Sequence, residues 1–201
     1  MKILAASDIH GDVNLVKSLV KKALDNSVDA VVLCGDLTMF GMEVDGLIKP
    51  FKHAGLKVLA VPGNHEDAAL LDFFSKFYGP NVFNLQTSVF QHGEIGFFGN
   101  SATRLGVSGE DDDKIEEILL QRGSEVSSLA KRVMVVHEPP YNTKLDNIGF
   151  SAGSVGVRNA IEKLQPDLCL CGHMHETFGK EDFINKTRVI NVGREGVILD
   201  L

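Results

Sequence analysis

The residues best suited to chemistry in this chain are Asp, Asn and His side chains that each follow a short apolar run. Ile3-Leu4-Ala5-Ala6 leads to Asp8 and His10, and Val133-Met134-Val135-Val136 ends at His137. Three further apolar stretches lead in the same way to polar residues: Asp36, then Asn64 and His65, then His173 and His175. Metal binding is the chemistry that such side chains share.

Short continuous apolar runs bounded by Gly or Pro are typical of fully buried strands. In open α/β sheets, ligands bind just outside the carboxyl ends of the strands. We therefore expect the fold to gather these distant residues at one sheet edge. Gly35, Gly63 and Gly172 stand where strands turn into loops. A side chain there would crowd the cluster or strain the backbone.

The mixture of ligand types indicates the kind of metal. Carboxylate, amide and imidazole groups together favour borderline divalent ions such as Mn, Fe, Ni or Zn, whereas a calcium site would use oxygen ligands alone. Seven ligands exceed what one tetrahedral ion needs, and they fit two ions about 4 Å apart that share a carboxylate and a hydroxide. Such a pair would activate a water and polarise a phosphoryl oxygen. The seven candidates are Asp8, His10, Asp36, Asn64, His137, His173 and His175.

In the first eighty residues, the apolar pattern predicts the strands and helices that would position Asp8, His10, Asp36 and Asn64. Strands are expected at 3–6, 30–34 and 57–61, and helices follow them at about 15–24, 44–53 and 67–78. Asp12 is the expected N-cap of the first helix. This β-α-β-α-β-α alternation is typical of a largely parallel sheet covered by helices.

The remainder of the chain has a different character. Short strands are predicted at 82–85, 88–91 and 95–99, and the acidic run Glu110–Asp113 is expected to be a solvated loop and a helix N-terminus. Further predicted elements are a strand at 133–136, a helix at 155–164 and strands at 168–171, 186–191 and 196–201. No repeat or linker divides the chain, so we predict a single domain spanning residues 1–201.

Net charge and hydropathy argue against a protein that binds nucleic acid or enters a membrane. The chain has 201 residues and a formal net charge of -7, which gives no general attraction for nucleic acid or anionic lipid. No stretch is long enough to span a bilayer, and the apolar start is broken at Ser7-Asp8, too early for a signal peptide. Cys34, Cys169 and Cys171 are an odd number within predicted strands, so we expect buried thiols and a cytoplasmic location.

The ordered set Asp8-x-His10, Gly35-Asp36, Gly63-Asn64-His65-Glu66, His137 and Gly172-His173-x-His175 resembles the calcineurin-like metallophosphoesterase family. Each of these five motifs alone is weak evidence for the family. Together, in this order and each at a predicted strand end, they are specific for it. The resemblance implies a four-layer α-β-β-α sandwich with two mixed β-sheets. The second sheet is expected to use the middle and tail strands.

The same resemblance implies roles for the individual residues. Asp8, His10 and His175 would hold one metal, Asn64, His137 and His173 the other, and Asp36 would bridge them. His65 would be the catalytic residue, close to the metals without ligating them, and would assist the leaving group after in-line attack by a metal-bridging hydroxide. Manganese is the preferred cofactor, with Fe, Ni, Co or Zn as alternatives.

Other residues keep two interpretations. Glu66 and Glu138 follow candidate residues and either orient their neighbours or lie on solvated loops. Four basic residues are candidates for a contact with a substrate phosphate, without a preference among them: Arg104, Lys144, Arg158 and Arg194.

Residues 35–41 indicate which branch of the family this chain resembles. Protein Ser/Thr phosphatases carry Gly-Asp-x-Val-Asp-Arg-Gly, but Met39 and Phe40 stand here where Asp and Arg are expected. The chain therefore resembles the small prokaryotic phosphoesterases, and hydrolysis of a small phosphodiester, such as one containing a nucleotide, is the first expectation. A phosphomonoesterase is the alternative, and a non-catalytic binding scaffold with this fold is a third. Assembly into a homo-oligomer stays open.

Overall fold

Two β-sheets packed face to face form the centre of the molecule, in a computed structural model that describes residues 1–42, 44–107 and 109–201. In the first sheet, β1 to β4 run parallel and β11 pairs antiparallel with β1. Its strands, in spatial order, are β11 (Val197–Asp200), β1 (Lys2–Ala6), β2 (Ala30–Cys34), β3 (Lys57–Val61) and β4 (Val82–Asn84).

The second sheet has a parallel centre and antiparallel edges. β6, β7, β8 and β10 are parallel, while β5 and β9 pair antiparallel at the two edges. Its strands, in spatial order, are β5 (Phe90–His92), β6 (Ile95–Gly99), β7 (Lys131–Val135), β8 (Leu168–Cys171), β10 (Thr187–Asn191) and β9 (Glu181–Ile184).

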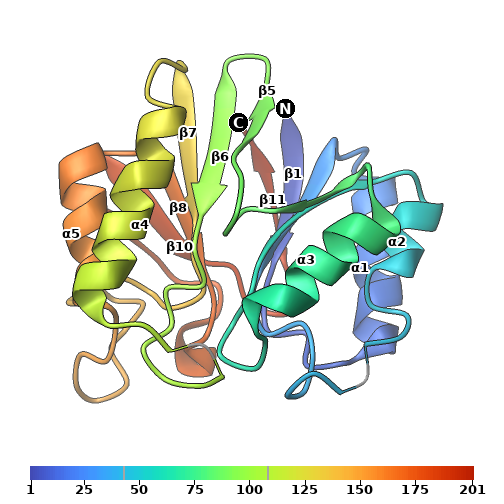
Figure 1. The fold of residues 1–201 in the computed structure, drawn as a ribbon, viewed down its shortest axis with the longest axis horizontal. Helices are drawn as coiled ribbons and strands as arrows, with labels where there is room; N and C mark the ends of the chain where they lie inside the picture. The colour runs from blue at the N-terminus through green and yellow to red at the C-terminus, as the bar shows by residue number, and fades with distance from the viewer. Residues whose placement is uncertain (43, 108) are drawn as a thin grey trace.

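Helices cover the outer face of each sheet, as Figure 1 shows. α1, α2 and α3 pack on the first sheet, and α4 and α5 pack on the second. Their bounds are α1 Val13–Asp25, α2 Lys49–His53, α3 Ala68–Tyr78, α4 Asp112–Glu125 and α5 Val155–Leu164. The expected four-layer α-β-β-α sandwich with two mixed sheets is therefore confirmed.

Alternation along the strands explains this layering. On β1, Ile3 and Ala5 belong to the apolar cluster between the two sheets, whereas Leu4 and Ala6 belong to the cluster beneath the helices. Since successive strand residues point to opposite faces, a strand that is apolar throughout must be covered on both sides. All of β1 except Lys2 is fully buried, so both faces of this strand are covered.

Several predicted elements are confirmed in detail. The Asp12 carboxylate caps α1 by accepting hydrogen bonds from the backbone N–H groups of Asn14 and Leu15. Asp111, within the acidic run, caps α4 in the same way through Lys114 N. Cys34, Cys169 and Cys171 are buried free thiols whose pKa values are raised by burial.

Four details differ from the sequence-based expectation. α2 begins at Lys49 rather than near residue 44, because Gly46 has φ +79° and Pro50 suits a helix start. β4 and β11 join the first sheet, although middle and tail strands were expected in the second. β9 was not predicted, because its largely exposed, charged sequence lacks the alternation of a half-buried strand.

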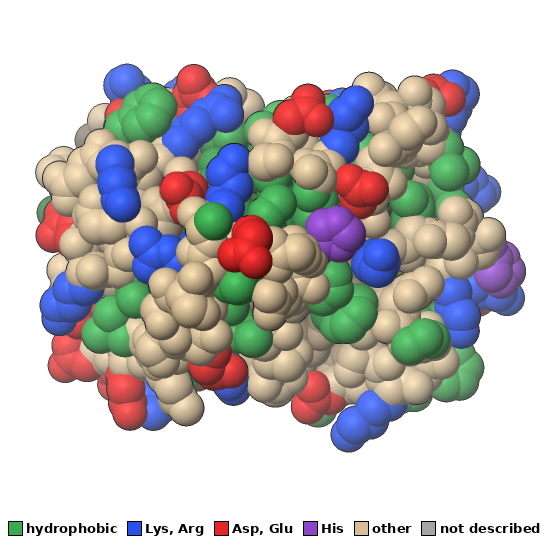
Figure 2. Space-filling view, turned by 90° about the horizontal axis from the view of Figure 1, so that it is seen from above, with side chains coloured by type: hydrophobic (Ala, Val, Ile, Leu, Met, Phe, Trp, Pro, Cys, Tyr) green, Lys and Arg blue, Asp and Glu red, His purple; other side chains and the backbone are tan. Residues whose placement is uncertain are grey.

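A membrane span requires a helix of sufficient length and hydropathy. None of the helices in the described ranges has both the length and the apolar character needed to cross a bilayer. Figure 2 views the end of the molecule that lies at the top of Figure 1, where basic and acidic side chains are intermingled.

Candidate metal centre

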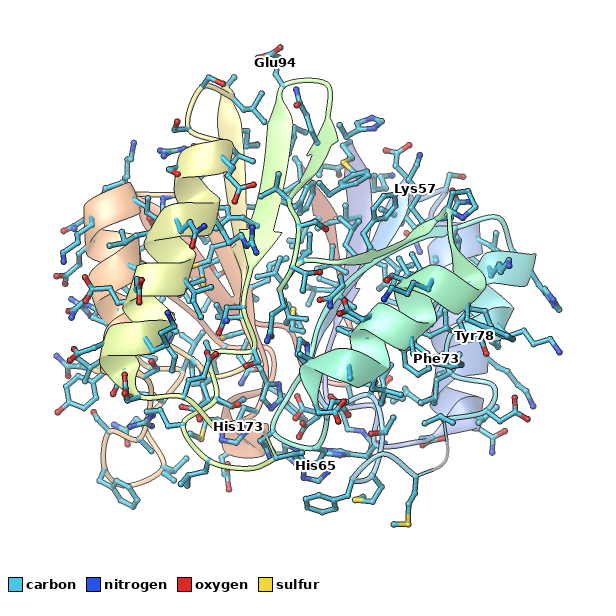
Figure 3. The ribbon with its side chains drawn as sticks, viewed as in Figure 1. Lys57, His65, Phe73, Tyr78, Glu94 and His173 are labelled. Atoms are coloured by element: carbon cyan, nitrogen blue, oxygen red, sulfur yellow. The ribbon has the colours of Figure 1, made fainter. Side chains whose placement is uncertain are left out.

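The candidate ligands come from the carboxyl ends of five strands in two sheets. β1, β2 and β3 of the first sheet and β7 and β8 of the second each end just before a candidate residue. Figure 3 shows His65 and His173, one from each sheet, close together at the lower end of the molecule, opposite Glu94. The structure thus brings all of the predicted site residues to one place, where they line or adjoin a hollow of about 370 Å³.

Asp8, His10 and His175 form the first group. The Asp8 Oδ1 atom lies 3.3 Å from His175 Nε2 and 3.9 Å from His10 Nε2. Asp8 is fully buried, and its other oxygen accepts a hydrogen bond of 3.0 Å from the backbone N–H of His173. This bond fixes the carboxylate so that Oδ1 faces the two imidazoles.

Asn64, His137 and His173 form the second group. His137 Nε2 lies 3.0 Å from Asn64 Oδ1 and 3.2 Å from His173 Nδ1. The other nitrogen, His137 Nδ1, lies 2.7 Å from the backbone carbonyl of Cys34 and donates to it when protonated. That contact orients the ring so that Nε2 faces the group, as an outer hydrogen bond does in metal-binding histidines.

Asp36 lies between the two groups. Its Oδ2 atom is 3.8 Å from His10 Nε2 and 3.5 Å from His137 Nε2, so one oxygen faces a histidine of each group. His65 Nε2 also lies 3.9 Å from this oxygen. The arrangement suits a bridging carboxylate with a further imidazole beside it.

The residues fit divalent cations by two criteria. Asp8 Oδ1 is buried and has no hydrogen-bond partner among the described residues, which is costly unless a cation completes it. Nitrogen and oxygen donors about 2.1 Å from a common ion lie about 3.0–3.4 Å apart. The Asp8–His175 and Asn64–His137 separations are of that size, so these groups need little rearrangement to bind a metal.

Burial and neighbouring charges shift the pKa values of several candidate ligands, in different directions. Burial would raise the pKa of Asp36, but the attraction of His137 and a hydrogen bond from His65 N hold it well below its usual range. Burial lowers the pKa of His10, and burial beside His137 lowers that of His173 to about 4. Burial also disfavours a charged His137, but Asp36 outweighs this effect and raises the pKa of His137 to about 9. A cation at His137 would therefore compete with a proton that Asp36 favours there.

The backbone beneath the site is unusual. Asp8, His10, Asp36 and His173 all have positive φ, between +50° and +69°. A left-handed conformation is uncommon in residues other than Gly, though Asp and His tolerate it better than most, and it often marks functional sites. These sharp turns direct several side chains from one strand edge into a common volume.

Close backbone approach explains Gly63 and Gly172. A Cβ atom on Gly63 would lie 2.1 Å from Asp36 Oδ1, and one on Gly172 would lie 2.6 Å from Asp8 Oδ2. Real Cβ atoms do not approach other atoms so closely, so neither position accepts a side chain without displacing a candidate ligand. The expected crowding at these glycines is confirmed.

Glu66 connects the two loops that carry Asp36 and His65. It is buried, and Oε1 accepts hydrogen bonds of 2.8 Å from both the backbone N–H and the hydroxyl of Thr38. Oε2 accepts a third bond of 2.9 Å from Gly63 N. Of the two interpretations of Glu66, the structure favours the orienting one.

Glu138 is also a buried orienting residue. It accepts bonds from both the backbone N–H and the side chain of Arg104, at 2.9 and 3.0 Å. Arg104 is therefore engaged with Glu138, and Lys144, Arg158 and Arg194 have partners of their own in Asp182, Glu162 and Asp12. None of these four basic residues lines the hollow.

We expect Glu66→Gln to destabilise the protein by about 1–3 kcal/mol, because an amide group cannot accept all three buried hydrogen bonds. The measurement is denaturant unfolding of the metal-free protein. Glu94→Gln is the matched control, since Glu94 is an exposed acid at the opposite end of the molecule. Equal unfolding free energies for the two variants would contradict the proposed role of Glu66 in holding the loops together.

The sequence analysis identified the candidate ligands but not the apolar residues beside them. Met39 lines the same hollow, and the ring of Phe40 stacks on His65 with centroids 4.0 Å apart and planes 17° apart. Met39 and Phe40 follow Asp36 by only three and four residues in the sequence, which suggests that they lie near the site. An apolar residue, however, carries no signal of its own that it faces a polar site.

The fold and the site together define an α/β protein with a candidate two-metal centre at the carboxyl edge of paired sheets. A family model for calcineurin-like phosphoesterases matches residues 1–177. The chain belongs to this family of metal-dependent phosphoesterases.

Individual proteins resemble this chain in sequence or in fold. An uncharacterized protein of Methanocaldococcus jannaschii is 30% identical over 198 residues, which cover 95% of this chain and 87% of that protein. The crystal structure of TT1561 of Thermus thermophilus has a TM-score of 0.76 at 21% identity, covering 96% of this chain and 90% of the other. A dimetal phosphatase from Danio rerio has a TM-score of 0.67 at 13% identity, with coverages of 96% and 87%. At these identities the two structures show a shared fold.

Proposed function

We propose that this protein is a two-metal phosphodiesterase. The observation that carries the proposal is the position of Asp36, whose Oδ2 faces His10 of one ligand group and His137 of the other. Asp8, His10 and His175 would hold one cation, Asn64, His137 and His173 the second, and Asp36 both. Two bound cations would supply a water of lowered pKa and positive charge opposite the phosphoryl oxygens.

The protein residues have distinct tasks in this proposal. His65 lies beside Asp36 without a hydrogen bond to Nδ1 from the described residues, and we assign it the proton transfer to the leaving oxygen. The backbone bond from His65 N to Asp36 Oδ1, at 3.0 Å, couples the position of the acid–base group to that of the bridging ligand. Glu66 holds both loops in register.

The charge of the hollow favours a diester over a monoester. None of its described lining residues is Lys or Arg, and Phe40 stands where protein phosphatases carry arginine. A monoester carries a second negative charge that such an arginine would offset, whereas a diester carries one. Phosphomonoester hydrolysis remains the second candidate. A scaffold role is the less favoured one, because the ligand set and His65 are all present. Manganese as the native metal and a cytoplasmic location stay predictions.

We expect the purified protein to hydrolyse bis(p-nitrophenyl) phosphate with Mn²⁺, because the clustered ligands suit this ion. EDTA should abolish the activity, and added Mn²⁺ should restore it. Release of p-nitrophenol measures the rate, and p-nitrophenyl phosphate, the monoester, should be the poorer substrate. Absence of turnover with Mn, Ni, Co, Fe and Zn alike would contradict an enzymatic role.

A further inference from the structure

A second hollow adjoins the candidate metal centre and shares His65 with it. Its volume is about 240 Å³, and its described lining residues are Phe40, Gly41, His65, Asp67, Leu70 and Val107. The metal-centre hollow also has His65 in its lining, together with Asp36 and Asn64. A substrate whose leaving oxygen is beside His65 would therefore extend its leaving group toward this second hollow.

The backbone holds Phe40 in an unusual conformation at the mouth of this hollow. Phe40 has φ +52° and Gly41 has φ +73°, between Met39 and Met42, whose backbones are joined by a hydrogen bond of 3.0 Å. A left-handed conformation is rare for a bulky side chain, so the surrounding contacts must hold it. Phe40 remains 59% exposed, and its ring is stacked on His65.

Hydrogen bonds connect the lining of the second hollow to residues of the metal centre. Thr38, next to the Phe40 turn, donates to Glu66, and its hydroxyl oxygen accepts from Gly41 N. Elsewhere in the lining, Val107 N donates to the backbone carbonyl of Asn64 at 3.1 Å. The hollow is thus built on the residues that carry His65 rather than on an independent surface loop.

The residues that line the second hollow indicate which chemical group it could bind. Phe40, Leu70 and Val107 offer apolar contacts, while Asp67 contributes a carboxylate and none of the described lining residues is Lys or Arg. Pockets for drug-sized ligands occupy about 300–1,000 Å³, so 240 Å³ accommodates a smaller group. Resting on the proposed function, we propose that this hollow binds the leaving group of the substrate, and that this group is an uncharged aromatic ring stacked beside Phe40.

Equilibrium binding tests the hollow without turnover. The probes are benzylphosphonate and cyclohexylmethylphosphonate, which have the same charge and similar size, titrated calorimetrically into the Mn²⁺-loaded protein. Because an aromatic pair adds a modest free energy beyond burial, we expect benzylphosphonate to bind about 3- to 10-fold more tightly. Phe40→Ala should remove this preference, and Phe40→Trp should keep it. Phe150→Ala, at an exposed aromatic residue outside this lining, should leave it unchanged.

Turnover separates a leaving-group site from a residue that only orients His65. Benzyl methyl phosphate and cyclohexylmethyl methyl phosphate have leaving alcohols of similar acidity, so chemistry alone favours neither strongly. Phe40→Ala should lower kcat/KM about 3- to 10-fold for the benzyl ester and less than 2-fold for the other. Equal losses for both esters, or no aromatic preference in the wild type, would overturn the inference. An aromatic preference in binding without any hydrolysis would instead contradict the proposed function and keep the binding site.

A charge comparison tests the contribution of Asp67. Its carboxylate should make 4-carboxybenzylphosphonate bind more weakly than the uncharged 4-carbamoylbenzylphosphonate. Asp67→Asn should reduce this difference several-fold while preserving the helix, since Asn caps α3 as well as Asp does. An unchanged difference in the variant would contradict the placement of the leaving group beside Asp67.

Discussion

Asp36→Asn should remove both metals together and abolish phosphodiester hydrolysis. The substitution keeps the shape of the side chain but removes the negative charge that faces His10 and His137 at 3.8 and 3.5 Å. Mutation of a group that merely supports a ligand costs about 10- to 100-fold in metal affinity, so loss of a shared ligand should cost at least about 100-fold at both positions. Metal analysis after dialysis against buffered Mn²⁺ measures the effect.

Asp200→Asn is the control for Asp36→Asn. It removes the same charge from an exposed position on β11, and should retain both metals and full activity. If Asp36→Asn loses one metal and holds the other at wild-type affinity, the bridging assignment is wrong. In that case Asp36 would belong to only one of the two groups.

His65→Ala should keep both metals but lower kcat by about 10²- to 10⁴-fold, the usual contribution of acid–base catalysis. The reason is positional, since His65 lies 3.9 Å from Asp36 yet belongs to neither of the two proposed ligand groups. Steady-state kinetics combined with metal analysis separate the two effects. The deficit should shrink for substrates whose leaving groups depart without a proton.

His92→Ala provides the matched control for His65→Ala, because His92 is an exposed histidine on β5 in the second sheet. It should have wild-type rates and metal content. Loss of one metal from His65→Ala would reassign this residue as a ligand. The geometry makes that a real test, because His10, Asp36 and His65 also form a group close enough to hold an ion.

The strands and their polar ends could be predicted because the signal is local. Continuous apolar runs such as β2 and β8 must be buried on both faces, and residues following parallel strands must meet at one edge. Asp36 and His173 were thereby expected at a common place before any pairing was known. The division of the seven residues into two groups came from the family resemblance and stays a prediction, since His10, Asp36 and His65 also lie close enough together to hold an ion.

Other features depend on contacts between distant residues and leave no local signal. β11 pairs with β1 across nearly the whole chain, and no pattern in either strand specifies that partner. Glu66 is buried because Thr38 and Gly63 supply its hydrogen bonds, whereas the sequence alone allowed a solvated position. The stacking of Phe40 on His65 likewise has no signal in the sequence.

The four left-handed residues at the strand ends have a consequence for heat resistance. Each such conformation disfavours the folded chain by about 1 kcal/mol or more, against a total stability of about 5–15 kcal/mol for typical proteins. Cations that bind only the folded form would offset this deficit, so the melting temperature should rise with the logarithm of their free concentration once it exceeds the dissociation constant. Replacing His10 or His173 with glycine would remove the local backbone strain and raise the melting temperature of the metal-free protein. The same replacement would remove an imidazole that we expect to bind metal.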